Sequence, residues 1–201
     1  MGNLESSKRS VTVYFLIDTS GSMDGEKMDN LNNFFRELIP EIKEMPKENT
    51  DVQAIKIAVL EYSSGATWIT SSGPVSVEEF NWRNIDAAGV TDLGAALKTL
   101  NEKLTASKGD SVLNRVFVLF IDGSPTDMWE NELAKLKENE KFKNGMKIGI
   151  PIGDIADIDV LNKFTGSKEL VSENFYNINR ICGFIYKSMT AYGTSASSSM
   201  P

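Results

Sequence analysis

The chain has 201 residues, of which 41% are hydrophobic and 24% charged, the composition of one soluble globular domain. Its formal charge of −7 disfavours binding to nucleic acid or to an anionic membrane, because their phosphates would repel it. The sequence contains no histidine, which excludes Ser-His-Asp and Cys-His catalysis and histidine-ligated zinc. Its single cysteine, Cys182, fits a reducing compartment, so we expect a cytoplasmic protein in which this thiol is a buried structural residue.

Apolar runs and helical patterns alternate along the chain. Continuous apolar or β-branched runs predict strands at Val11–Ile17, Gln53–Tyr62, Ala66–Thr70, Asn114–Ile121, Met146–Ile152 and Leu170–Phe175. Apolar residues at helical spacing predict helices at Glu26–Glu44, Val77–Trp82, Asp92–Ala106, Met128–Phe142, Ile158–Phe164 and Asn177–Thr190. We expect Pro46 to end the first helix. We expect a disordered N-terminus at residues 1–10, one domain at 11–190 and a disordered tail at 191–201.

The strands are apolar throughout rather than alternating, which is typical of strands buried on both faces. Together with the alternation of strands and helices, this predicts an α/β fold with a doubly wound, mostly parallel central sheet and helices on both faces. The short run Ala66–Thr70 follows a tight turn and is expected to be one antiparallel edge strand.

Polar residues follow two strands that should be neighbours in such a sheet. The first strand ends in Asp18 and the fourth in Asp122. In the common strand order 3-2-1-4-5-6 these strands lie side by side at the point where ligands bind. Thr91 opens the helix before the fourth strand, which places it on a loop at the same edge. We therefore expect two carboxylates and a hydroxyl to lie close together there.

Asp18, Ser20 and Ser22 are spaced two residues apart, so their side chains point the same way in an extended loop. With Thr91 and Asp122 added, every candidate ligand atom is an oxygen. Hard oxygen ligands without His or Cys favour Mg²⁺, with Mn²⁺ or Ca²⁺ as alternatives. The sequence therefore predicts a metal site formed by Asp18, Ser20, Ser22, Thr91 and Asp122.

The segment Asp18–Ser22, Thr91 and the pair Asp122–Gly123 form three motifs that are separated in the sequence. They resemble the metal-ion-dependent adhesion site of von Willebrand factor A domains, in motif order and element order over about Val11–Thr190. The resemblance implies a Rossmann-like fold in which Ser20, Ser22 and Thr91 bind the metal directly. It implies that Asp18 and Asp122 act mostly through water.

The same resemblance implies that an open coordination position accepts a Glu or Asp from a partner protein. The stretch Asp122–Trp129 is similar to one in TerY-like bacterial members, which are associated with tellurium-resistance and stress gene clusters. This implies a partner such as a kinase or a phosphatase of the same gene cluster.

Five further residues are candidates for contact with a partner: Asp24, Asp92, Asp127, Trp129 and Trp82. Asp24 and Asp92 lie near the expected metal site and would add negative charge. Asp127 has an alternative role as the cap of the helix starting at Met128. Both tryptophans have an alternative role in the core.

The rival hypothesis is a Mg²⁺-dependent phosphotransferase or phosphatase with Asp18 as nucleophile. Enzymes of the haloacid-dehalogenase type place a second Asp two residues further on, where this chain has Ser20. The sequence also has no phosphate-cradling GxxxxGK[ST] motif. We therefore expect a non-catalytic binding domain.

Overall fold

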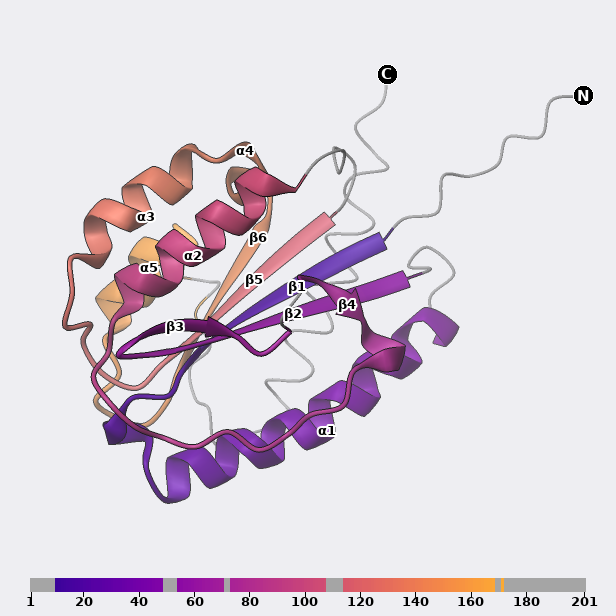
Figure 1. Cartoon of the computed structure of the whole chain (residues 1–201), viewed down its shortest axis with the longest axis horizontal. Coiled ribbons are helices and arrows are strands. Elements are labelled where there is room, and N and C mark those ends of the chain that lie inside the picture. The colour runs from indigo at the N-terminus through magenta and orange to yellow at the C-terminus, as the bar shows by residue number, and fades with distance from the viewer. Residues whose placement is uncertain (1–9, 49–53, 71–72, 108–113, 169–170, 172–201) are drawn as a thin grey trace, which may run out of the picture.

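A mixed β-sheet forms the middle of the molecule (Figure 1). The computed structural model describes residues 10–48, 54–70, 73–107, 114–168 and 171. Across this part of the chain the sheet order is β3-β2-β1-β5-β6, and β4 also pairs with β2. The strands are β1 (Ser10–Asp18), β2 (Ala54–Ser63), β3 (Gly65–Trp68), β4 (Val75–Ser76), β5 (Asn114–Ile121) and β6 (Met146–Pro151).

The long strands of the sheet are parallel. β1 pairs in parallel with β2 and with β5, and β5 pairs in parallel with β6. The short strands β3 and β4 both pair with β2 in the antiparallel direction. The predicted fold class is therefore confirmed, although two short strands pair antiparallel where one was expected.

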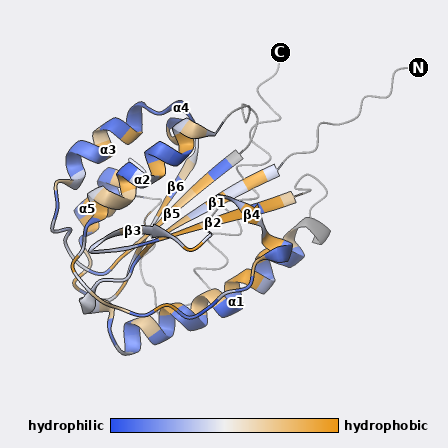
Figure 2. Ribbon diagram, in the orientation of Figure 1, coloured by the Kyte–Doolittle hydropathy of each residue, from blue (hydrophilic) through white to orange (hydrophobic). Residues whose placement is uncertain are grey.

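Helices cover both faces of this sheet (Figure 1). One face packs on α1 (Glu26–Glu48), and the other packs on α2 (Leu93–Ala106), α3 (Trp129–Glu138) and α5 (Ile158–Thr165). Successive residues of β1 enter opposite core clusters: Phe15 lies in the α1 cluster and Leu16 in the α2 cluster. This two-sided burial explains why the strand is apolar throughout, and Figure 2 shows hydrophilic and hydrophobic residues alternating along the helices, as one buried face requires.

Two predicted helices have different bounds in the structure. The first helix, predicted to stop before Pro46, continues to Glu48. Met45 is 1% exposed and extends the buried apolar stripe of α1, so packing outweighs the local preference of proline to end a helix. The helix predicted at Val77–Trp82 is only a 3₁₀ turn, Val77–Glu79.

The helix predicted at Met128–Phe142 is two helices, α3 and α4 (Glu140–Lys143). They are separated by Asn139, whose backbone is extended and whose side chain accepts a hydrogen bond from the Lys141 backbone N–H at 3.0 Å. Asn139 therefore caps the start of a new helix, a role that asparagine favours.

Several predictions lie outside the described residues: the last helix at Asn177–Thr190, the burial of Cys182, and the disorder expected at the chain ends. Ser10 is already part of β1. Of the strand predicted at Leu170–Phe175, Val171 forms a parallel bridge with Gly149 of β6. None of the helices in the described ranges combines the length and apolar character needed to cross a bilayer.

Candidate functional site

The carboxyl ends of β1 and β5 bring Asp18 and Asp122 together. The register pairs Ile17 with Phe120, so the two aspartates follow this pair on adjacent strands. Asp18 Oδ1 accepts a hydrogen bond from the Ser20 backbone N–H at 2.9 Å, and Asp18 Oδ2 accepts one from the Asp122 backbone N–H at 3.5 Å. Both aspartates are 0% exposed, so two acidic groups are buried at the end of the sheet.

Two serine hydroxyls complete this cluster. Ser20 Oγ lies 3.1 Å from Ser22 Oγ, and the Ser22 hydroxyl donates to Asp122 Oδ1 at 2.9 Å. Ser20 is buried, whereas Ser22 is exposed. The cluster therefore reaches from the buried strand ends to the molecular surface.

The loop that carries Thr91 is bonded to the loop after β1. The Gly21 N–H donates to Gly89 O at 3.0 Å, and the Ala88 N–H donates to Thr19 O at 2.8 Å. Gly89 has φ +84°, and a Cβ there would lie 2.5 Å from Ser64 Oγ, so this close approach requires glycine. These contacts hold the Thr91 loop against the Asp18–Ser22 segment.

Thr91 also bonds to the segment that follows β5. Its N–H donates to Thr126 Oγ1 at 3.2 Å, and its carbonyl accepts from the Thr126 N–H at 2.9 Å. Thr91 is buried. The five predicted metal residues therefore lie at one edge of the sheet, on three chain segments that hydrogen bonds join to one another.

Two of the predicted acidic neighbours differ in their surroundings. Asp92 Oδ2 accepts from the Gly65 N–H at 3.0 Å, and Asp92 Oδ1 accepts from the Thr126 hydroxyl at 3.3 Å. Asp92 therefore fixes loops to each other. Asp24 directly follows the 3₁₀ turn Gly21–Met23 and is exposed.

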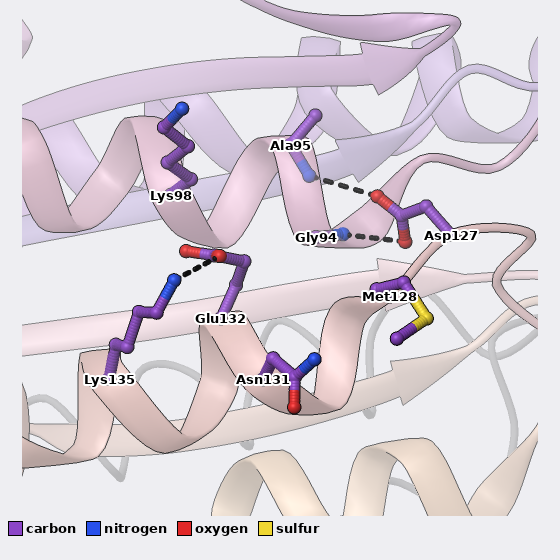
Figure 3. A pocket seen from close by; sticks show the side chains of 8 residues that line it. All are labelled: Gly94, Ala95, Lys98, Asp127, Met128, Asn131, Glu132 and Lys135. Atoms are coloured by element: carbon purple, nitrogen blue, oxygen red, sulfur yellow. Dashed lines mark hydrogen bonds and ion pairs between the residues drawn. The ribbon is translucent and has the colours of Figure 1, made fainter.

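Asp127 caps a helix, but a different helix from the one that the sequence suggested. Its two carboxylate oxygens accept from the Gly94 N–H at 2.9 Å and the Ala95 N–H at 3.0 Å, at the start of α2 (Figure 3). In the helix that follows it, α3, the N-cap residue is Met128, whose side chain makes no capping hydrogen bond. The alternative that Asp127 caps the helix starting at Met128 is therefore wrong.

The two tryptophans make contacts within the fold. The Trp82 ring stacks on Phe35 with centroids 4.2 Å apart, and its indole N–H donates to Asn32 Oδ1 at 3.1 Å. Trp129 packs against the core cluster of α2, and Lys163 Nζ lies 5.3 Å from its ring centroid. These contacts match the core alternative that the sequence left open.

A surface pocket lies between α2 and α3, beside the Asp127 cap (Figure 3). Its lining mixes polar and apolar groups and includes an ion pair of 2.6 Å between Lys135 and Glu132. The lining residues are Gly94, Ala95, Lys98, Asp127, Met128, Asn131, Glu132 and Lys135.

The electrostatics of the site are dominated by its buried carboxylates. Burial raises the pKa of Asp18 to about 6; hydrogen bonds from Ser20 oppose this rise, and the nearby charge of Asp122 adds to it. A positive charge at this place would therefore stabilise the ionised pair.

Sequence reasoning missed Lys27, which supplies such a charge. Its Nζ lies 3.0 Å from Asp122 Oδ2 and donates to Ser22 O at 3.2 Å. The sequence feature that could have indicated Lys27 is a lysine in the first turn of a helix, where the helix dipole favours acidic residues.

The donor set fits a hard cation. Two carboxylates and neighbouring hydroxyls offer oxygen only, which suits Mg²⁺, Mn²⁺ or Ca²⁺. In the described ranges, no three or more His, Cys, Asp or Glu residues gather as a metal-binding group. A cation here would therefore depend on the serine and threonine hydroxyls as well as on Asp18 and Asp122.

Solved structures share this fold. Proximal thread matrix protein 1 from the mussel byssus, with a zinc-occupied MIDAS motif, is 18% identical with a TM-score of 0.63, over 90% of this chain and 48% of its own. The PilB minor pilin of Streptococcus sanguinis (D319A mutant) is 17% identical with a TM-score of 0.67, over 100% of this chain and 65% of its own. A von Willebrand factor type A protein from Catenulispora acidiphila is 16% identical with a TM-score of 0.63, over 90% and 43%.

The chain thus spans about half the length of the mussel protein. A comparison with curated proteins gives no match. The family model of the von Willebrand factor type A domain matches residues 12–181. Since this match covers most of the chain and agrees with the fold, the chain belongs to the von Willebrand factor type A domain family.

Proposed function

We propose that this domain is a metal-dependent protein-binding module. A single divalent cation is held by Asp18, Ser20, Ser22, Thr91 and Asp122, and it captures an acidic side chain of a partner protein. The observation that carries the proposal is the hydrogen-bonded cluster of two buried carboxylates and two hydroxyls, which reaches the surface at Ser22. Mg²⁺ is the first candidate, with Mn²⁺ and Ca²⁺ as alternatives, and the zinc-occupied MIDAS motif of the mussel relative supports a divalent ion.

The chemistry of the donors favours an acidic partner. Serine and threonine hydroxyls are neutral, so they leave much of the charge of a dication uncompensated. A carboxylate from a partner would neutralise that charge and replace a water molecule in the coordination shell.

The surroundings of the site favour a protein rather than a small ligand. The exposed large hydrophobic residues of the described chain are Val90, Met128, Ile155 and Ile158. Val90 and Met128 lie in the loops that lead into α2 and α3, and Ile155 and Ile158 lie at or just before the start of α5. In a parallel α/β sheet these helix starts share the edge with the strand ends of the site, and exposed apolar side chains beside a polar centre are typical of protein interfaces.

The position of Asp18 supports a binding role over nucleophilic catalysis. Both of its carboxylate oxygens accept backbone hydrogen bonds, from Ser20 and Asp122, and the residue is 0% exposed. A nucleophile must reach the substrate atom that it attacks, whereas a carboxylate that acts on a metal through water needs no direct contact with a ligand. We therefore propose a non-catalytic domain.

The partner is, in this proposal, a protein that presents a Glu or Asp, such as a kinase or a phosphatase in a bacterial stress or tellurite-resistance system of the TerY type. The stretch Asp122–Trp129 supports this setting through its similarity to TerY-like members, and the single cysteine fits the cytoplasm. Affinity capture from the native cell in Mg²⁺ and in EDTA tests it: the partner should be retained only in Mg²⁺. Equal retention in EDTA would show that recognition uses another surface.

Metal binding can be tested on the purified chain by thermal unfolding. A ligand at about 100 times its Kd stabilises the folded state by about 2.7 kcal/mol, which raises the Tm of a domain this size by about 5–10 °C. We expect this rise when millimolar Mg²⁺ or Mn²⁺ is added to EDTA-stripped protein. The Thr91→Ala variant should fold but lose most of the rise, because it lacks one ligand.

The matched control is Thr91→Ser, which keeps the hydroxyl and should keep the metal response. Ser22→Ala should behave like Thr91→Ala, since Ser22 is exposed and contributes no core packing. If both alanine variants respond to metal as fully as the parent, the site is misplaced.

A further inference from the structure

Lys27 contacts both the segment after β1 and the residue that follows β5. It lies in the first turn of α1, and its Nζ contacts Asp122 Oδ2 at 3.0 Å and Ser22 O at 3.2 Å. Its side chain is 22% exposed, whereas that of Asp122 is 0% exposed. The ammonium group therefore lies at the mouth of the cluster, over a buried carboxylate.

The position of the Lys27 charge would be unfavourable without the carboxylate of Asp122. The N-terminus of a helix carries partial positive charge, which favours acidic side chains and disfavours cations. The other charged residues at this end of α1, Glu26 and Asp29, follow that preference. Lys27 departs from it, and the carboxylate of Asp122 supplies the compensating charge.

The contacts of Asp122 leave neither of its oxygens unoccupied. Oδ1 accepts from the Ser22 hydroxyl at 2.9 Å, and Oδ2 accepts from Lys27 at 3.0 Å. A carboxylate oxygen can accept more than one contact, so a dication that uses Asp122, directly or through water, must either lie close to the Lys27 ammonium or replace it. An ammonium group left beside a dication would be repelled by it and by the end of the helix.

We propose that the Lys27 ammonium is the resident counter-ion of the site, and that a divalent cation binds by displacing it from Asp122. This inference rests on the proposed function, because it concerns the same metal. Lys27 then sets the metal concentration at which the site loads, since the apparent affinity falls with the fraction of molecules in which the ion pair is closed. At low metal concentration, Lys27 keeps the buried Asp122 paired.

Calorimetric titration of the full chain with Mg²⁺ and Mn²⁺, after EDTA stripping, tests this competition. Lys27→Met keeps a long apolar stem but removes the charge, and we expect it to bind either ion about tenfold more tightly than the parent, as for an ion pair closed in nine molecules of ten. Lys27→Arg keeps the charge and should bind metal like the parent. Lys43→Met is the matched control, because it makes the same charge change about 24 Å further along the same helix.

The outcomes separate this inference from the proposed function. If neither the parent nor Lys27→Met binds either ion, the metal site itself is refuted, and the inference is refuted with it. If the parent binds metal and Lys27→Met binds within twofold of it, only the role of Lys27 is overturned. Tighter binding by Lys43→Met to the same degree would also overturn it, because the effect would then be one of net charge.

A second measurement follows the displacement directly. Brief labelling with an amine-reactive ester, read by mass spectrometry, should modify Lys27 several-fold faster in saturating Mg²⁺ than in EDTA, because the freed ammonium group loses its carboxylate partner. Labelling of Lys43 should not change. An unchanged rate at Lys27, in protein that calorimetry shows to be loaded, would overturn displacement.

Discussion

Replacing Asp127 by alanine should weaken the start of α2 without touching the core. The change removes two charge-assisted hydrogen bonds, of 2.9 Å to the Gly94 N–H and 3.0 Å to the Ala95 N–H. Loss of a helix cap costs about 1 kcal/mol and up to about 2, and loss of a negative charge at a helix N-terminus adds about 0.3–1 kcal/mol. We therefore expect Asp127→Ala to lower the free energy of unfolding by about 2 kcal/mol, and the Tm by about 4–8 °C in a domain of this size.

Urea unfolding followed by circular dichroism, in EDTA, measures this difference without a contribution from metal. Asp127→Asn should lose about half as much stability, because it keeps one oxygen acceptor but lacks the charge. Asp154→Ala is the control, since it removes an exposed carboxylate from a nearby loop. A loss below about 0.5 kcal/mol for Asp127→Ala, equal to that of the control, would refute the assignment of Asp127 as the cap of α2.

Two further substitutions test the packing around the Asp127 cap and around Trp82. Gly94→Ala would place a Cβ 2.7 Å from Asp127 Oδ2 and 3.0 Å from the Trp129 Cα, so we expect a loss of about 1–3 kcal/mol in urea unfolding; equal or greater stability would show that the cap can shift freely. Trp82→Ala would remove the stack on Phe35 and the bond to Asn32. We expect it to cost about 2 kcal/mol, and a fully stable variant would return Trp82 to the candidates for partner contact.

The fold could be predicted from the sequence because its central strands carry a strong local signal. The strand at Asn114–Ile121 has the predicted bounds, and β1 differs by one residue at each end. Helix ends were harder to predict, because packing decides them. The burial of Met45 carries α1 past Pro46, and the cap at Asn139 divides a stretch whose apolar spacing favours one continuous helix.

In the site, the sequence could predict residues that a strand end positions, and it could not predict pairings between separate elements. Asp18 and Asp122 follow from the order of the parallel strands. The bond of Asp127 to the start of α2 spans 33 positions of sequence, and the ion pair of Lys27 with Asp122 spans 95. Such pairings depend on where the helices lie on the sheet, which residue spacing alone does not specify.

The polar side chains of Asp122, Ser124, Thr126 and Asp127 all bond to other parts of the fold. Asp122 accepts from Lys27 of α1, Thr126 bonds to the backbone of Thr91, and Asp127 caps α2. Ser124 donates to Asp157 at the start of α5 at 2.8 Å. A protein engineer who transplanted these six residues into another α/β domain would move the donors and acceptors without their counterparts. The transferable unit is the edge of the sheet together with the starts of α1, α2 and α5, so variation within this edge must involve several chain segments together.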